Sequence, residues 1–207
     1  MFDWLTSGST ALTVAARWVS LDLETSGLNA KTDHIVEVGA VGLYQGAISL
    51  GDSFHRVNAE GGTLTGDNRV LHGVSAAEQR DGRPLTTLLD ELIAWMQEAP
   101  LVGFHTQFDL GFLRAALAHR IGVKAARGFG RDYLDLAVIA PVVFPSVKAR
   151  SLAEWTAALN LPVRKQHRAM VDALATAHLL QRVCAALPQE ERSFHALKLR
   201  ESARRWL

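Results

Sequence analysis

The stretch VSLDLETSGL, residues 19–28, most strongly constrains the fold, because it joins a strand pattern to a pair of acids. Apolar and polar residues alternate from Val19 to Leu23, and this period of two predicts a β-strand. Residues two apart on a strand share a face, so Asp22 and Glu24 are expected to project together. A hard divalent cation would relieve their repulsion, whereas a strand end in solvent would make the pair harmless. The motif alone leaves both interpretations open.

The composition indicates one globular domain. A chain of 207 residues with 48% hydrophobic residues can bury one sizeable core. The net charge of +1 names no partner, but residues 147–207 hold eleven Lys and Arg against five Asp and Glu. This basic end fits either a polyanionic partner or an ordinary helix surface. The single Cys184 excludes an internal disulfide, and we expect it to be a small core residue in a reducing compartment.

No segment predicts export or membrane insertion. Residues 1–16 carry an acid and lack the basic region of a secretory signal, so we expect a loose arm or a short helix there. The longest apolar run, residues 136–144, is too short to span a membrane and contains Pro141. We therefore expect a cytoplasmic protein that has no membrane partner.

The first part of the chain predicts a meander of three strands. Val, Ile and small residues predict strands at 17–24, 34–44 and 47–57, with a turn at Gln45 and Gly46. Because no helix separates these strands, we expect them to pair in antiparallel fashion.

The rest of the chain alternates helices with short strands. Capping boxes at Ser75 and Ser151 predict two helix starts, and apolar residues follow Pro84 at helical spacing. A helix–strand–helix run after the meander favours a parallel addition to the sheet. The remaining expected elements are a strand at 101–105, a helix at 108–120, a short strand and a helix interrupted at Pro141 within 131–144, a helix at 170–187, and a basic, partly amphipathic helix from Gln189 to Leu207.

Two further acids open predicted helices. Asp109 follows the strand at 101–105 and has apolar neighbours, and Asp172 lies in the first turn of the last long helix. The helix dipole favours an acid in a first turn, so each acid alone has an ordinary explanation. His167 lies five residues before Asp172 in a basic loop, where it is either simply solvated or placed to take a proton from an attacking water.

Taken in order, these residues resemble one family, the DnaQ-like 3′–5′ exonucleases of the DEDD class. The chain is similar to the subgroup that has His before the last Asp, which includes polymerase III epsilon-type proofreading exonucleases and related ribonucleases. The shared order is Asp-x-Glu on the first strand, Phe-Asp opening a later helix, and His-x-x-x-x-Asp opening the last long helix. The matching segments are VSLDLETSGLNAKTDHIVEVGAV, LHGVSAAE, LVGFHTQFDLGFLRAAL, DYLDLAVIA and HRAMVDALATAHLL.

The resemblance implies an α/β fold of the ribonuclease H-like class, a mixed five-stranded sheet flanked by helices. It also implies that Asp22, Glu24, Asp109 and Asp172 hold two Mg²⁺ or Mn²⁺ ions. Two such ions about 4 Å apart can clamp a phosphodiester. Carboxylate oxygens are better ligands for Mg²⁺ and Mn²⁺ than for zinc. His167 would be the general base, and the product would be a nucleoside 5′-monophosphate.

The resemblance further assigns residues to the terminal nucleotide. Phe108 matches a position near the terminal nucleotide, but a role in the core explains it more easily. Asp135 is assigned a structural role. Phe104 and His105 stand where many members have His and Asn. The residues expected to contact the nucleotide are Leu23, Thr25, Leu71, His72, His105 and Phe108.

The implied partners are single-stranded DNA or RNA 3′ ends, with DNA the first choice. No motif reports contacts to the sugar 2′-hydroxyl, so an exoribonuclease is the alternative. A non-catalytic nucleic-acid-binding domain is disfavoured because no carboxylate of the motif is missing. A polymerase or other protein partner and a homodimer both stay open. We expect the exonuclease domain at 17–187, with an arm at 1–16 and a basic C-terminal helix at 188–207 packed on or extending the domain.

Overall fold

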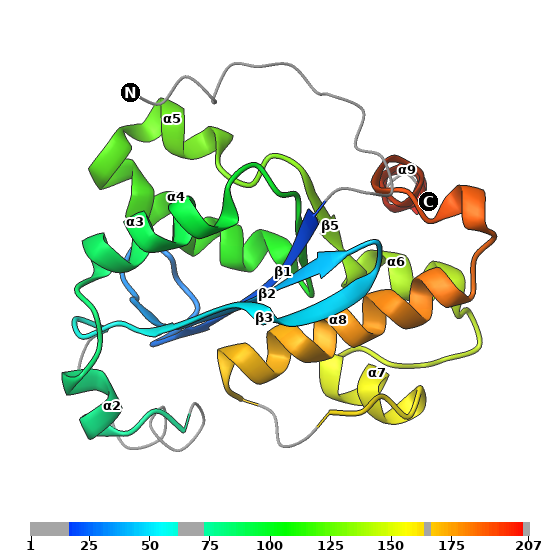
Figure 1. Ribbon diagram of the computed structural model, residues 1–207, viewed down its shortest axis with the longest axis horizontal. Coiled ribbons are helices and arrows are strands. Elements are labelled where there is room, and N and C mark those ends of the chain that lie inside the picture. The colour runs from blue at the N-terminus through cyan, green and yellow to red at the C-terminus, as the bar shows by residue number, and fades with distance from the viewer. Residues whose placement is uncertain (1–16, 62–72, 164–166, 205–207) are drawn as a thin grey trace.

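Strand β1 (Arg17–Thr25) lies at the centre of a mixed five-stranded sheet with the order β3-β2-β1-β4-β5 (Figure 1). Helices cover both faces of this sheet, so the α/β class expected from the sequence is confirmed. The expected arm at residues 1–16 lies outside the described part of the chain. The computed structural model describes residues 17–61, 73–163 and 167–204.

The predicted meander of three strands is confirmed. β1 pairs antiparallel with β2 (Ile35–Tyr44), which pairs antiparallel with β3 (Ala47–Val57). The hairpin between β2 and β3 turns at Gln45 and Gly46, whose φ angles are 52° and 80°. Two consecutive positive φ angles match the right-handed twist of the paired strands, which explains this tight two-residue connection.

The predicted parallel addition is also confirmed. β4 (Leu101–Gly103) pairs parallel with β1, and β5 (Tyr133–Asp135) pairs parallel with β4. β4 is shorter than the expected strand because the chain turns at His105, which has a φ of 61°, and then enters a helix. This places the start of that helix beside the acidic end of β1.

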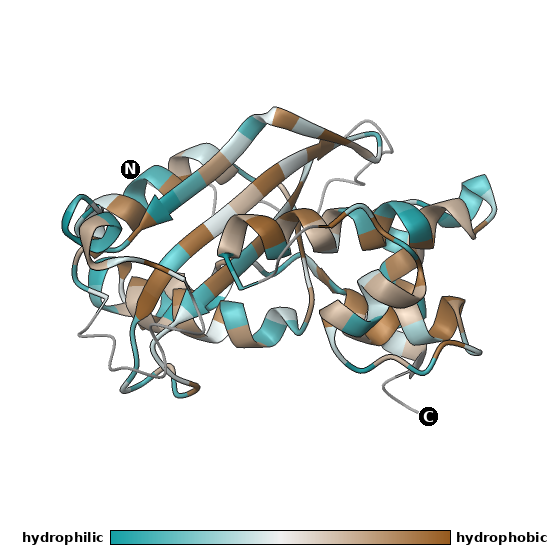
Figure 2. Ribbon diagram, turned by 90° about the horizontal axis from the view of Figure 1, so that it is seen from below, coloured by the Kyte–Doolittle hydropathy of each residue, from teal (hydrophilic) through white to brown (hydrophobic). Residues whose placement is uncertain are grey.

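The alternation along β1 separates two layers of core. Val19, Leu21 and Leu23 pack under α3 (Leu85–Met96) and α4 (Thr106–Ile121). The same alternation of hydropathy is visible along the strands in Figure 2. The opposite face packs against α6 (Leu136–Val143), α7 (Leu152–Ala158), α8 (Ala169–Ala185) and α9 (Phe194–Arg204).

The helix starts follow the predicted caps closely. Both capping boxes are formed, by Ser75 at α2 (Ala76–Arg80) and by Ser151 at α7. The expected interruption at Pro141 is wrong, because α6 runs through this residue and ends two residues later at Val143. The φ angle that proline fixes is compatible with a helix, so Pro141 removes one N–H donor without ending α6. The sequence did not predict the described helix α5 (Val123–Gly128). The single helix expected from Gln189 onward is divided into the 3₁₀ turn η2 (Gln189–Glu191) and α9.

The C-terminal helix α9 packs against β5 and α6. The Phe194 ring lies 5.7 Å from the Trp18 ring, centroid to centroid, and Leu197 is fully buried. Lys198 Nζ donates to the Tyr133 carbonyl at 2.6 Å, so part of the basic character of this segment serves its docking. None of the described helices is long and apolar enough to cross a membrane.

Candidate active site

β1 carries Asp22 and Glu24 on the face that it turns toward α8. Ser20 Oγ, two residues before Asp22, donates to the Ala173 carbonyl of α8 at 2.7 Å. Side chains two apart share a face of a strand, so the acids point the same way. The prediction that Asp22 and Glu24 project together is confirmed, because their carboxylate oxygens lie within 4.8 Å of each other.

α8 supplies a third acid. Carboxylate oxygens of Asp22, Glu24 and Asp172 all lie within 4.8 Å of one another. Gly39, opposite Asp22 on β2, lets the first turn of α8 come this near, because a Cβ atom there would lie 2.2 Å from the Ala169 backbone. Since no larger residue fits that space, this glycine is required for the acids to meet.

α4 supplies a fourth acid from the parallel half of the sheet. Asp109 is 4% exposed, and its Oδ1 accepts a 3.1 Å hydrogen bond from the Leu23 N–H. Leu23 separates Asp22 from Glu24 along the chain, so Asp109 lies where its charge acts on both. Asp109 thus lies beside the strand acids, and its part in metal binding stays a prediction.

Burial and neighbouring negative charges raise the pKa values of Asp22, Asp109 and Asp172. Burial, and then the negative charges of Asp109, Asp172 and Glu24, hold the pKa of Asp22 well above its usual range. Burial raises the pKa of Asp109 to about 8 and that of Asp172 to about 6. A shared divalent cation would remove this repulsion, because it binds the ionised form of each carboxylate.

Asp172 offers a buried oxygen that has no hydrogen-bond partner in the described part of the chain. Its Oδ2 accepts a 3.2 Å hydrogen bond from the His167 N–H, whereas its Oδ1 is buried without a hydrogen bond among the described residues. Such unpartnered buried atoms are rare in native proteins and call for an explanation. A hard cation fits both this oxygen and the all-carboxylate donor set, which suits Mg²⁺ and Mn²⁺.

His167 stands immediately before Arg168, the N-cap residue of α8, and is exposed. Its φ of 73° lies in the left-handed region, which a non-glycine residue adopts at a cost. Its N–H bond to Asp172 holds this backbone in place, so the imidazole is attached next to the acid cluster. The role of His167 as a general base stays a prediction.

Two of the residues expected at the nucleotide are already engaged within β1 and its turn. The Leu23 side chain is buried in the core, and its N–H is bonded to the α4 acid. Thr25 Oγ1 donates to the Gly27 carbonyl at 2.7 Å and so stabilises the turn after the strand. Leu71 and His72 lie outside the described residues.

The other two expected nucleotide contacts lie at the start of α4. His105 is the left-handed N-cap residue of the helix, and its N–H donates to Asp135 Oδ1 at 2.9 Å. Asp135 also caps α6 by accepting from the Ala137 N–H at 3.0 Å, which gives it the structural role that the sequence suggested. Phe108 is half-buried, and its ring lies 5.1 Å from that of Phe112, which favours the core interpretation.

The sequence interpretation overlooked Glu37 and Arg168. Glu37 lies in β2 with a fully buried side chain, and Arg168 Nη2 lies 2.9 Å from its Oε1. The available signal was a single acid inside the apolar strand segment IVEVGAV, because acids are almost never fully buried unless they are paired.

A model of a known protein family matches most of the chain. Residues 19–180 match the family model RNase_T, which describes an exonuclease. The chain belongs to this exonuclease family. The matched range includes all four carboxylates and His167, so the family resemblance seen in the sequence is confirmed.

The relatives of this exonuclease family include much longer proteins. DNA polymerase III PolC-type of Listeria innocua is 28% identical over 187 residues, which are 90% of this chain and 12% of that protein. The same enzyme of Listeria monocytogenes is 30% identical over 164 residues, which are 79% of this chain and 11% of that protein. The chain therefore spans only a small part of the length of these relatives.

Solved structures of nucleases share the fold. Cell-death related nuclease 4 superposes with a TM-score of 0.69 at 18% identity, covering 82% of this chain and 64% of that one. E. coli exonuclease I in complex with a dT13 oligonucleotide superposes with a TM-score of 0.71 at 14% identity, covering 89% of this chain and 46% of that one. The expected ribonuclease H-like fold is thereby confirmed, and with the family match so is the nuclease class.

Proposed function

We propose that this domain is a metal-dependent 3′–5′ exonuclease that releases nucleoside 5′-monophosphates from single-stranded 3′ ends. The observation that carries the proposal is the cluster of Asp22, Glu24 and Asp172 oxygens within 4.8 Å, in a member of an exonuclease family. The buried Asp172 Oδ1 supports it, because this atom has no hydrogen bond among residues 17–61, 73–163 and 167–204 and a bound cation would give it a partner.

Asp22, Glu24, Asp109 and Asp172 would hold two Mg²⁺ or Mn²⁺ ions. When bound, these ions would supply Lewis acidity toward the scissile phosphate and neutralise charge at the leaving 3′ oxygen. The positive charge of the ions would favour the ionised forms of Asp22, Asp109 and Asp172, which offsets their raised pKa values.

The remaining residues of the site have separate tasks in the proposal. His167 takes the proton from the attacking water, and its exposed position allows it to pass that proton to solvent. Thr25 and the Leu23 backbone border the terminal nucleotide from β1, His105 and Phe108 border it from the start of α4, and Leu71 and His72 complete the contact. The Leu23 N–H is bonded to Asp109 and is therefore not available to the nucleotide. We expect the nucleotide to contact the rest of this strand end and the turn that follows it.

We propose DNA as the first substrate. The support is the PolC-type DNA polymerase relatives and the fold shared with an exonuclease I structure that holds a dT13 oligonucleotide. Trimming of RNA ends is the second candidate, because the same chemistry acts on either sugar and discrimination depends on contacts to the 2′-hydroxyl. Because these relatives are DNA polymerases, we propose a polymerase as the protein partner. A second copy of the chain is the alternative.

The deciding experiment is digestion of 3′- and 5′-labelled single strands of DNA and RNA of one sequence, with Mg²⁺, with Mn²⁺ and with EDTA. We expect stepwise shortening from the 3′ end, DNA faster than RNA, and no product in EDTA. Asp22→Asn should lower the rate more than about 100-fold, because even residues that only orient metal ligands cost 10–100-fold. Asp132→Asn is the matched control, since this exposed acid precedes the edge strand β5 and is not one of the clustered carboxylates.

Three outcomes would contradict parts of the proposal. Oligonucleotide binding without cleavage in either metal would favour a non-catalytic domain. Shortening from the 5′ end would refute the polarity. Equal rates for wild type and Asp22→Asn would refute the assigned site.

A further inference from the structure

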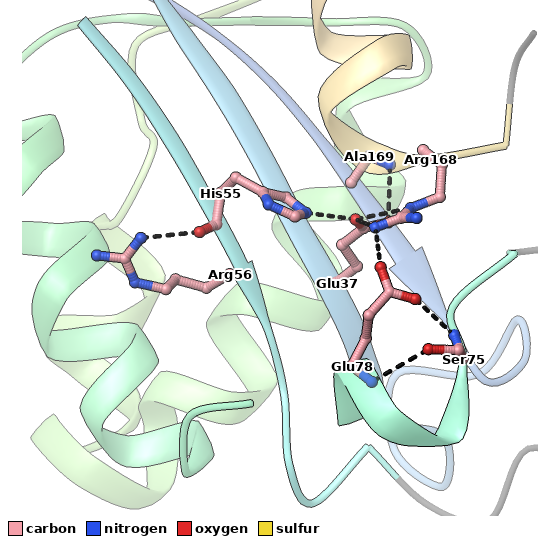
Figure 3. A network of polar contacts seen from close by, with 7 residues as sticks. All are labelled: Glu37, His55, Arg56, Ser75, Glu78, Arg168 and Ala169. Carbon is pink, nitrogen blue, oxygen red and sulfur yellow. Dashed lines mark hydrogen bonds and ion pairs between the residues drawn. The ribbon is translucent and has the colours of Figure 1, made fainter. Parts of the chain in front are cut away.

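Glu37 is held by a network of polar contacts with His55, Arg168 and Ala169 (Figure 3). Its Oε1 accepts from Arg168 Nε at 3.0 Å and lies beside His55 Nε2, and its Oε2 accepts from the Ala169 N–H at 3.1 Å. Both oxygens are thus bonded inside the protein. Glu37 therefore differs from Asp172, whose Oδ1 has no partner among the described residues.

The Glu37 carboxylate caps the N-terminus of α8. Arg168 occupies the N-cap position but makes no side-chain cap hydrogen bond, so the Ala169 N–H depends on Glu37 for its acceptor. A carboxylate is also favoured there by the helix dipole. Asp172 lies in this same first turn, and its N–H is bonded to the Arg168 carbonyl at 3.0 Å. The cap thus determines where Asp172 approaches the β1 acids.

Arg168 extends the network to α2. Its Nη2 donates to Glu78 Oε1 at 3.0 Å, and Glu78 closes the capping box with Ser75. A Cβ atom on Gly73 would lie 3.6 Å from Arg168 Cδ, so this glycine packs against the arginine stem. Gly73 directly follows His72 in the chain. One guanidinium therefore joins the start of α8, the central sheet and the segment that enters α2.

The charges keep this network formed. Burial alone would raise the pKa of Glu37, but the hydrogen bonds from His55, Arg168 and the Ala169 N–H bring it below the usual value. The pKa of Arg168 is raised, and its hydrogen bond to Glu37 is the largest cause. Glu37 lies opposite Glu24 in the pairing of β1 with β2, so the charge of Arg168 offsets a negative charge next to the acid cluster.

We propose that Glu37 and Arg168 are positioning residues, whose pairing holds the backbone from His167 to Asp172 against the acids of β1. This inference rests on the function proposed above for that site. Neither side chain needs to touch the substrate, because each acts through the backbone of the α8 start. Without the pair, His167 and Asp172 would move relative to Asp22 and Glu24, so turnover would fall more than substrate binding.

The test compares Glu37→Gln and Arg168→Lys with Glu91→Gln as the matched control. Glu91 also pairs with an arginine, Arg56 Nε at 2.6 Å, but on the α3 side of the sheet. The measurements are kcat and KM on a labelled single strand, Mn²⁺ affinity by calorimetry, and amide hydrogen exchange over residues 167–172 in EDTA.

For Glu37→Gln we expect kcat and Mn²⁺ affinity to fall about 10–100-fold, with KM changed less than about threefold. Amides of residues 167–172 should exchange faster, while exchange in the central strands stays slow. Arg168→Lys keeps the charge but loses the two-pronged contact, so its kcat should lie between those of Glu37→Gln and wild type. Glu91→Gln should match wild type in every measurement.

The double variant Glu37→Gln with Arg168→Met separates positioning from simple stability. It removes both charges, so stability should recover relative to Glu37→Gln alone, whereas kcat should stay low. A kcat that returns together with stability would overturn the proposal. So would wild-type kcat, Mn²⁺ affinity and exchange in Glu37→Gln. An inactive wild type would refute the exonuclease function instead, and the exchange and Mn²⁺ data would still decide the positioning role.

Discussion

Asp109 provides the sharpest test of the electrostatics of the cluster. The substitution Asp109→Asn removes its titration while keeping an amide oxygen that can accept from the Leu23 N–H. Asp109 is 4% exposed, and its pKa is raised by burial from 3.8 to about 8. Between these two values the folded protein binds a proton that the unfolded chain has lost, so stability falls as pH rises.

The size of the effect follows from that shift. One pKa unit corresponds to about 1.4 kcal/mol, so the shift from 3.8 to about 8 lowers the free energy of unfolding by on the order of 5 kcal/mol at pH 8. At pH 5 the same group costs under about 2 kcal/mol. Between pH 5 and pH 8 the free energy of unfolding of the metal-free wild type should therefore fall by on the order of 3 kcal/mol more than that of Asp109→Asn.

Urea denaturation in EDTA at both pH values measures this difference. Asp132→Asn serves as the control for the removal of one surface charge, and its pH dependence should follow that of wild type. Equal pH dependence in wild type and Asp109→Asn would refute the reasoning. A wild type that is more stable at pH 8 than at pH 5 in EDTA would contradict it more directly.

Further predictions concern metal binding and packing. Millimolar Mn²⁺ should raise the melting temperature of wild type but not that of Asp22→Asn, because binding to the native state stabilises it; differential scanning calorimetry checks this. Gly39→Ala should destabilise by about 1–3 kcal/mol and lower exonuclease activity, because its Cβ would lie 2.2 Å from the α8 backbone. Leu197→Ala should cost about 2–5 kcal/mol in urea denaturation, because this α9 side chain is fully buried.

Much of the fold was predictable because its signals are local. The three antiparallel strands follow from alternation and from the turn at Gln45 and Gly46. The capping boxes at Ser75 and Ser151 mark helix starts within one residue. The end of α6 was not predictable in this way, because a proline in a short final turn is a weak stop.

The candidate site was predictable only in part. Asp22 and Glu24 share a face by strand geometry alone, whereas Asp109 and Asp172 each had an ordinary explanation as first-turn acids. Their order along the chain, matched to a family, led to the prediction that they meet. No local pattern indicated that Asp109 accepts a hydrogen bond from Leu23 or that Asp172 keeps an unpartnered oxygen.

The sequence by itself determined the strand with two acids on one face, the capped helices, and the set of four carboxylates with His167. The strand pair, the caps and the spacing of His167 from Asp172 depend on relations between residues two to five apart, which the chain carries wherever it folds. The set of four carboxylates was recognised from its order along the chain. Only the tertiary structure decided how the acids converge: through Gly39, which admits α8, and through Glu37, which caps a helix that begins 132 residues later. Such contacts join segments far apart in the chain, and they exist only once the sheet has placed β1 and β2 under α8.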